Sequence, residues 1–404
     1  MENQPAANGF DTARLRTLII GCLAALAGLM AGLDIGVISG ALDLLAQTFH
    51  ASTVQQEWIV SAMMGGAAVG SLCGGWMSHQ IGRKHALLVG AAVFVAGSLA
   101  CALAWSIPSM IVGRLIMGLA IGVAALPYSP RWLMMRGRRK EALDVLVDLR
   151  DDRSAAMQEI QNISRQLQQK QRGWSLLRHN SNFRRSIFLG MTLQVMQQLA
   201  GVNVVMYYAP KIFALAGYIG PAQLWCTAMV GLVNMLATFI AIGLVDRWGR
   251  KPILYTGFVI MAVGMGCLGF MLNRPNLGQT EQIISVFMLL IYISGFAMSA
   301  GPLIWVLCSE VQPLQGRDLG ISISTLTNWI ANMIVGASFL SLLQWMGNGP
   351  TFWLFAGFNL IFVVVTWRFI PETRDMSLEK IEQRLMAGLP LREIGQGEPL
   401  PDGR

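Results

Sequence analysis

Ten stretches of mostly apolar residues, each long enough to cross a bilayer, constrain this chain more than any other feature. A membrane-spanning helix needs roughly 20 such residues, because every backbone polar group must be hydrogen-bonded within the helix. The predicted spans cover residues 17–39, 57–77, 86–106, 109–127, 186–209, 222–244, 253–272, 283–307, 319–343 and 351–370. We therefore expect an all-α protein that spans the membrane many times.

The composition agrees with a membrane protein and excludes several other classes. Only 13% of the residues are charged and 54% are hydrophobic, whereas soluble domains carry about 25% charged residues. The net charge of +8 comes from basic residues in short polar segments between the apolar stretches. Such a distribution is typical of cytosolic loops and not of a nucleic-acid-binding surface.

No motif for cofactor, metal or covalent chemistry is visible. The six cysteines all fall in apolar stretches without metal-ligand spacing, so we interpret them as small core residues. The four histidines do not cluster, and no nucleotide-phosphate loop or hydrolase triad is present. We therefore predict a protein that is not an enzyme and needs no cofactor. The first apolar stretch has no cleavage site after it and is predicted to be a retained span.

Basic residues alternate between the loops and predict the orientation. Loops 40–56, 273–282 and 344–350 are nearly free of Lys and Arg. Cations occupy the other loops: Arg14, Arg16, Arg83, Lys84, residues 131–185, Arg247, Arg250, Lys251, Arg317, Lys380 and Arg384. Positive loops face the cytoplasm. Both termini are therefore expected on the cytosolic side of the cytoplasmic membrane. This arrangement requires an even number of spans.

The chain contains two related halves. The segment "HQIGRKHALLVG" at 79–90 corresponds to "DRWGRKPILYTG" at 246–257. Repeated helical bundles are typical of secondary transporters. We predict four regions: a truncated bundle of four spans, a cytosolic helical linker, a bundle of six spans and a cytosolic tail, at residues 1–130, 131–185, 186–371 and 372–404.

The first half is shorter than the second. Lys251 to Pro371, where the second half leaves the membrane, is about 120 residues, whereas Lys84 to Pro130 is about 46. The deficit of about 74 residues is enough for two spans and keeps their number even. It falls after residue 124, where "GLAIGVA" passes at once into "LPYSPRWL".

Several motifs together identify a family. They are "GLDIGVISGAL" (32–42), "QQLAGVNVVMYYAPKIF" (197–213), "VDRWGRKP" (245–252), "GPLIWVLCSEVQPLQGRD" (301–318), "NWIANMIVG" (328–336) and "PETRDMSLEKIE" (371–382). The chain resembles the sugar porter family of the major facilitator superfamily, and especially its bacterial arabinose– and galactose–proton symporters. That family has twelve spans in two bundles. The resemblance implies that the fourth span here joins the start of the family's fourth helix to the end of its sixth.

Two charges within predicted spans are candidates for proton coupling. Asp34 is the only acid in the middle of the first span, and Arg114 is the only cation in the apolar part of the fourth. Charges at this depth are costly and usually face a cavity or a partner. The resemblance implies that Asp34 binds and releases a proton beside Arg114. The alternative is a static buried ion pair.

Amide side chains in the fifth span are candidates for sugar binding, because amides both donate and accept hydrogen bonds, as sugar hydroxyls do. Gln194 and Gln198 share one helix face and Gln197 lies beside them. The resemblance implies central sugar contacts from Gln197, Gln198 and Asn203, with Tyr207 and Tyr208 closing the outer side. The alternative is hydrogen bonding between buried helices.

Further sugar contacts are implied at Asn234, Phe296, Gly301, Trp305, Asn328 and Asn332. An indole such as that of Trp305 can stack on a pyranose and donate one hydrogen bond, and Gly301 and Pro302 mark a place where a helix can be interrupted near a cavity. Simple aromatic packing is the alternative for Trp305.

A cytosolic gate is implied by charges at the inner ends of the helices. Its second-half residues are Asp246, Arg247, Gly249, Arg250, Lys251, Glu310 and Arg317; the first-half copy retains only Arg83 and Lys84. Charge pairs of this kind would hold one state closed and break on opening. The alternative is that the cations only set the orientation.

We predict proton-coupled import of an aldose such as arabinose or galactose by alternating access. A sugar-binding membrane sensor without transport, or a non-functional remnant, are the alternatives, because the first bundle is incomplete. The predicted partners are a small sugar and the lipid bilayer. The sequence selects neither the sugar nor an oligomeric state.

Overall fold

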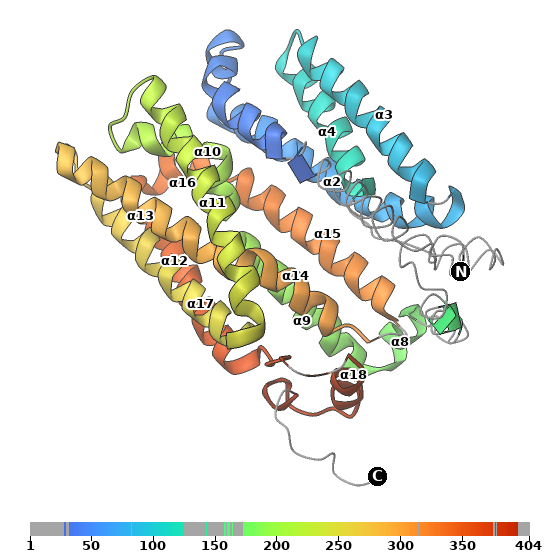
Figure 1. The fold of residues 1–404 in the computed structure, drawn as a ribbon. Helices are drawn as coiled ribbons and strands as arrows, with labels where there is room; N and C mark the ends of the chain where they lie inside the picture. The colour runs from blue at the N-terminus through green and yellow to red at the C-terminus, as the bar shows by residue number, and fades with distance from the viewer. Residues whose placement is uncertain are drawn as a thin grey trace, which may run out of the picture.

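The computed structural model describes residues 28–29, 32–81, 83–124, 143, 157–158, 160–161, 164, 173–313, 316–374, 376 and 378–394. These residues form helices joined by short turns, arranged as two groups that lie side by side (Figure 1). The predicted linker between the groups falls mostly outside the described residues, apart from its last helix, α8 (Gly173–His179).

The first group contains a helix over 32–48, followed by α2 (Thr53–Ile81), α3 (Arg83–Ala102) and α4 (Ile107–Ala124). Glycines let α2 and α4 approach closely. A Cβ atom at Gly118 would lie 1.9 Å from the Met63 carbonyl oxygen, and one at Gly66 would lie 2.2 Å from the Leu115 carbonyl oxygen. Small residues at four-residue spacing allow such contacts between membrane helices, and here they fix the position of Arg114 on α4.

The second group contains the remaining long helices. They are α9 (Ser181–Leu199), α10 (Val202–Leu215), α11 (Pro221–Trp248), α12 (Arg250–Leu272), α13 (Gln279–Met298), α14 (Ala300–Glu310), α15 (Arg317–Gly336), α16 (Phe339–Met346) and α17 (Asn348–Phe369). After them come the short helix α18 (Leu378–Met386) and the 3₁₀ turn η2 (Leu391–Glu393).

Three predicted spans are each divided into two helices, α9–α10, α13–α14 and α15–α16. At the first break, Gly201 has a φ of 95°, which suits glycine. The break frees the Ala200 carbonyl, which accepts hydrogen bonds from Tyr292 Oη at 2.8 Å and Asn359 Nδ2 at 3.1 Å. Broken membrane helices persist where neighbours satisfy the freed backbone groups, as they do here.

Each of the ten predicted spans coincides with one helix or one broken pair, although the first is described only from residue 28 onwards. Six segments of the described chain are long and apolar enough by themselves to cross a membrane, and a shorter apolar helix covers Ile107–Val123. The predicted all-α membrane architecture is confirmed.

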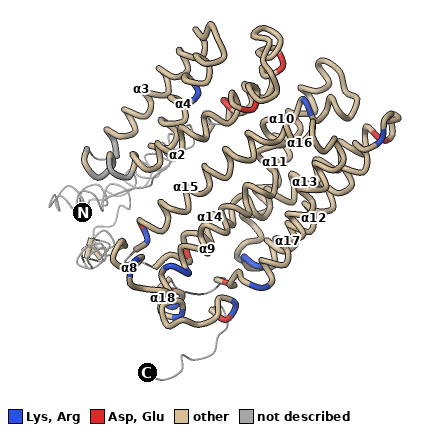
Figure 2. Tube along the Cα trace, turned by 180° about the vertical axis from the view of Figure 1, so that it is seen from behind, with Lys and Arg blue, Asp and Glu red and all other residues tan. Residues whose placement is uncertain are grey.

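Basic side chains gather at one end of the helices. Figure 2 shows most Lys and Arg residues at the end that carries α8 and α18, and few along the middle of the molecule. We call this the basic end. It contains the start of α12 and the start of α15, and the loops that join α2 to the preceding helix and α16 to α17 lie at the opposite end.

Candidate functional site

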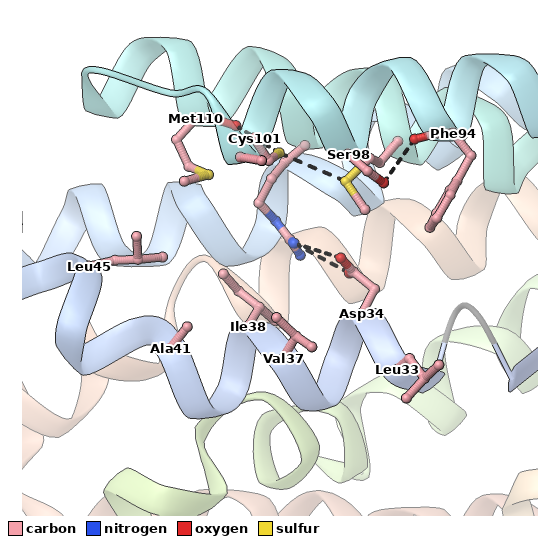
Figure 3. A pocket seen from close by; sticks show the side chains of 13 residues that line it. Leu33, Asp34, Val37, Ile38, Ala41, Leu45, Phe94, Ser98, Cys101 and Met110 are labelled. Atoms are coloured by element: carbon pink, nitrogen blue, oxygen red, sulfur yellow. Dashed lines mark hydrogen bonds and ion pairs between the residues drawn. The ribbon is translucent and has the colours of Figure 1, made fainter.

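Asp34 and Arg114 meet across the first group of helices. Arg114 Nη1 on α4 lies 3.2 Å from Asp34 Oδ1 and 3.3 Å from Oδ2 (Figure 3). Arg114 Nη2 lies 3.7 Å from Met63 Sδ. The side chains are 10% exposed for Asp34 and 3% for Arg114. The structure therefore joins the two intramembrane charges that the sequence singled out, even though the chain is short at the end of α4.

A pocket of about 390 Å³ adjoins this ion pair. All of its lining residues come from the helix over 32–48, α3 and α4, and most are apolar (Figure 3). Leu33 and Val37, which line it, are 54% and 66% exposed, so the pocket is open on that side. The carboxylate thus lies beside a cavity of the first group, on a face that nothing in the described residues covers.

A network of amides joins three helices of the second group. Asn328 Nδ2 on α15 donates to Gln194 Oε1 at 2.7 Å and to Gln197 Oε1 at 2.8 Å. Gln197 Nε2 donates in turn to the carbonyls of Ala300 and Gly301, at 3.1 and 3.0 Å. Both carbonyls belong to the first turn of α14, directly after the break from α13. The network therefore fixes the position of the helix that carries Trp305.

Four more predicted residues, on α9, α10 and α15, extend the polar region. Asn203 Nδ2 donates to Gln198 Oε1 at 2.5 Å. Tyr207 is buried, and the Asn332 side chain of α15 lies beside it. Asn332 Oδ1 is buried without a hydrogen-bond partner among the described residues. Because an unpaired buried acceptor is costly, this atom is available to a hydroxyl donor.

The remaining predicted contacts differ in their surroundings. Tyr208 Oη donates to the Gly336 carbonyl at 2.8 Å, and its ring lies 5.2 Å from that of Phe339. Phe296 is buried, and a Cβ atom at Gly301 would lie 3.2 Å from its ring. Trp305 is 42% exposed. Within the described chain, no hydrogen bond joins the side chain of Trp305 or Asn234 to the amide network.

At the basic end, Glu310 pairs with residues from two other segments. Arg250 Nη2 lies 3.3 Å from Glu310 Oε1, and Thr373 Oγ1 donates to Glu310 Oε2 at 2.6 Å. Arg317 Nη2 donates to the Ser309 carbonyl at 2.6 Å, one residue before Glu310. Three predicted gate residues of the second half, Arg250, Glu310 and Arg317, are thus close together. The side chains of Arg83, Lys84 and Asp246 lie outside the described part of the chain.

Glu372 contacts these predicted gate residues, and sequence reasoning did not single it out. Its carboxylate accepts from the backbone N–H groups of Arg250 and Lys251, both at 3.0 Å, and so caps the start of α12. Gly249 is required beside it, because its φ is 90° and a Cβ atom there would lie 2.7 Å from Glu372 Oε2. The available signal was an acid within "PETRD", directly after the last span.

Metal binding has no support in the described residues, because they contain no group of three His, Cys, Asp or Glu side chains able to hold an ion. The geometry instead offers an intramembrane ion pair beside an open pocket, a buried amide network at two helix breaks, and a charged cluster at the basic end. None of these is an arrangement for covalent catalysis.

Comparison with known proteins gives close relatives. The chain is 48% identical to the galactose-proton symporter of Escherichia coli K12, over 94% of this chain and 96% of the relative. It is 42% identical to the arabinose-proton symporter of the same organism, over 95% and 96%. A solved structure of the proton:xylose symporter XylE of the major facilitator superfamily, bound to 6-bromo-6-deoxy-D-glucose, superposes with a TM-score of 0.76 at 26% identity, covering 92% of this chain and 98% of XylE.

The comparisons also support the deficit after residue 124. The alignment with the galactose-proton symporter spans 447 residues, whereas 94% of the 404 residues here is about 380, so about 67 aligned positions lack a counterpart. The family model for "Sugar (and other) transporter" matches in two pieces, residues 20–126 and 121–385, which meet at the predicted joint. Since these matches cover most of the sequence and the named relatives are transporters and not enzymes, the chain belongs to the sugar transporter family of the major facilitator superfamily.

Proposed function

We propose that this protein imports an aldose together with a proton across the cytoplasmic membrane, by alternating access of a site between its two helical bundles. The observation that carries the proposal is the ion pair between Asp34 and Arg114, which remains formed at 3.2 Å despite the shortened first bundle. Both termini lie in the cytosol, because the basic end carries the positive loops. The coupling ion is the proton, and no cofactor is needed.

Asp34 would bind and release the coupled proton. As a carboxylate it is attracted to the Arg114 guanidinium, and protonation removes that attraction. The two helices that carry these residues are then free to change their relative position. An acid that alternates between a charged, paired form and a neutral, unpaired form gives a two-state element of the kind that coupling requires.

The sugar would bind beside the amide network of the second bundle. Gln197, Gln198 and Asn203 lie around the break between α9 and α10, and Asn328 reaches the same amides from α15. The free Asn332 Oδ1 can accept from a sugar hydroxyl. Trp305 is exposed and can offer its indole face to a ring. We propose Tyr207, Tyr208, Asn234, Phe296 and Gly301 as the remaining contacts of this site.

The gate of the proposed cycle lies at the basic end. Arg250, Glu310 and Glu372 tie the start of α12 to the end of α14 and to the segment after α17. Arg247, Gly249, Lys251 and Arg317 belong to the same gate, with Arg83, Lys84 and Asp246 added by resemblance. Breaking such pairs accompanies the opening of one side in switching proteins.

One observation favours a second candidate, sugar binding without transport. The pocket beside Asp34 is open through Leu33 and Val37, because the first bundle is short. Bundles that move as rigid bodies need complete packing. A protein with an intact amide network and an incomplete first bundle could hold a sugar and fail to move it.

Uptake measurements in cells that lack their own sugar transporters test the proposal. Labelled galactose and arabinose are supplied to cells that make this protein or its Asp34→Asn variant, at equal membrane levels on a blot. We expect uptake that an uncoupler abolishes and that Asp34→Asn reduces by about tenfold or more, since an amide cannot carry the proton. Sugar binding by the purified protein without uptake would establish the second candidate, and loss of both would leave a non-functional remnant.

A further inference from the structure

A seam along α2 joins the first bundle to the second at the end opposite the basic loops. Four residues at four-residue spacing on α2 contact α15 or α16, namely Thr53, Glu57, Ser61 and Gly65. Thr53 Oγ1 accepts from Gln344 Nε2 at 2.5 Å, and a Cβ atom at Gly336 would lie 3.8 Å from Ser61 Cβ. Further along, a Cβ atom at Gly65 would lie 3.1 Å from Met333 Sδ.

Glu57 lies within this seam and is the only charged side chain among these contacts. Its Oε1 accepts from the backbone N–H of Ser341 and its Oε2 accepts from Ser341 Oγ, both at 2.7 Å. Glu57 is only 2% exposed. Both of its oxygens are therefore satisfied by a single residue of the other bundle.

The position of Ser341 explains the contact. Ser341 is the third residue of α16, and the helix's own preceding residue, Ser338, makes no side-chain cap. The first N–H groups of a helix have no partner within it, and carboxylates are favoured at that end. The break between α15 and α16 creates this helix start inside the protein. Glu57 thus caps a helix of the second bundle from a helix of the first.

The seam does not continue to the basic end. Val69, the next residue of the same α2 face after Gly65, is 52% exposed, and Leu72 is 56% exposed. The close contact between α2 and the α15–α16 pair is therefore concentrated in the half that begins at Thr53. An interaction placed there controls whether this end is open or closed.

We propose that Glu57 is the outer latch of the two bundles, closing the outer end when its carboxylate caps α16 and releasing it when that cap is broken. The proposal rests on the alternating-access function proposed above and adds a residue to it. Opening lets water reach both groups, so the lost hydrogen bonds are replaced and the step is reversible. In this latch the negative charge of Glu57 interacts with the N-terminus of α16. It differs from the Asp34–Arg114 pair, because no cation faces Glu57 in the contacts of the seam.

A disulfide across the seam measures closure without requiring transport. The Cβ separation of 3.8 Å between positions 61 and 336 equals the mean of natural disulfides. Ser61→Cys and Gly336→Cys are introduced together, and the full-length protein in membranes is oxidised mildly, without sugar or proton gradient. Mass spectrometry of the digested protein then gives the rate at which the linked peptide pair forms, and the native cysteines do not interfere with its identification.

We expect rapid linkage with Glu57 present and about a tenfold lower rate in Glu57→Ala, comparable to the loss of a strong helix cap. Ser341→Ala, which removes one of the two bonds and keeps the backbone N–H, should give an intermediate rate and guards against misfolding of the first variant. Ser322→Ala is the matched control, because the Ser322 hydroxyl donates to the Asp318 carbonyl of its own helix, and it should change the rate little. Equal rates with and without Glu57, or no linkage in its presence, would overturn the latch. Cross-linking does not depend on uptake, so this test of the latch can be interpreted even if the protein does not transport sugar.

Discussion

At the scale of single residues, most polar groups of the candidate sites inside the membrane lie against another polar group. Arg114 forms an ion pair with Asp34 at 3.2 Å, and Asn328 Nδ2 donates hydrogen bonds to both Gln194 and Gln197. Such groups cost free energy when left alone in hydrocarbon. Asn332 Oδ1 is one of several buried side-chain atoms without a partner in the described residues, and Gln194 Nε2 and Thr366 Oγ1 are others. We propose a sugar hydroxyl as the donor to Asn332 Oδ1.

The amide network gives a residue-scale prediction. Asn328→Ala should raise the sugar concentration for half-maximal uptake by about tenfold, because Gln197 loses the donor that orients it and the site loses a hydrogen-bonding side chain. Sugar dependence of uptake, at matched membrane levels, measures this. Thr327→Ala is the control, since the Thr327 hydroxyl donates to the Ile323 carbonyl of its own helix. An equal effect of both variants would contradict a specific role for Asn328.

At the scale of elements, glycines and helix breaks decide which faces meet. Gly66 and Gly118 let the backbones of α2 and α4 touch, and this contact places Arg114 opposite Asp34. The breaks at Gly201 and before Ala300 bring helix ends into the middle of the second bundle. Backbone groups at such ends bind polar partners, which a continuous helix cannot do.

The α2–α4 contact gives a prediction at this scale. Gly118→Ala should destabilise the protein by about 2 kcal/mol, because its Cβ atom would overlap the Met63 carbonyl oxygen and force the helices apart. Thermal unfolding of the purified protein in detergent measures the loss. Gly231→Ala is the matched control: nothing lies within 4 Å of a Cβ atom at Gly231, so its melting temperature should stay unchanged or rise. Equal stability of the two variants would show that α2 and α4 do not pack in this way.

At the scale of the whole molecule, the unequal lengths of the two bundles dominate. The second bundle keeps its amide network and its charged cluster at the basic end, whereas the first leaves the pocket beside Asp34 open through Leu33 and Val37. The seam along α2 then carries much of the contact between the bundles in the described part of the chain. Completing the first bundle should therefore affect closure of the molecule more than it affects the sugar site.

A chimera tests this expectation. The residues that the galactose-proton symporter has and this chain lacks are inserted after residue 124, which adds about 67 positions. We expect a higher melting temperature and faster uptake, because the two added spans cover the exposed face of the first bundle. The same number of residues of polar linker at this position is the control. No gain of the chimera over the linker control would show that the shorter chain is already complete for its function.

The sequence by itself determined the ten spans, their expected orientation, the two related halves and the position of the shortened joint. These properties follow from hydropathy, loop charge and spacing, which are local along the chain. The same local patterns picked out Asp34, Arg114 and the amides of the fifth span, because polar residues are rare in apolar stretches.

Only the tertiary structure decided which of these groups meet. It joined Asp34 to Arg114 across 80 positions, assigned Asn328 to Gln197, and gave Glu372 and Glu57 their places at the starts of α12 and α16. The physical reason is that both glutamates accept hydrogen bonds from free N–H groups at the start of a helix in another segment. A helix start inside a predicted span exists only because packing breaks that span. A pattern read along one helix carries no record of which neighbouring helix supplies the missing partner.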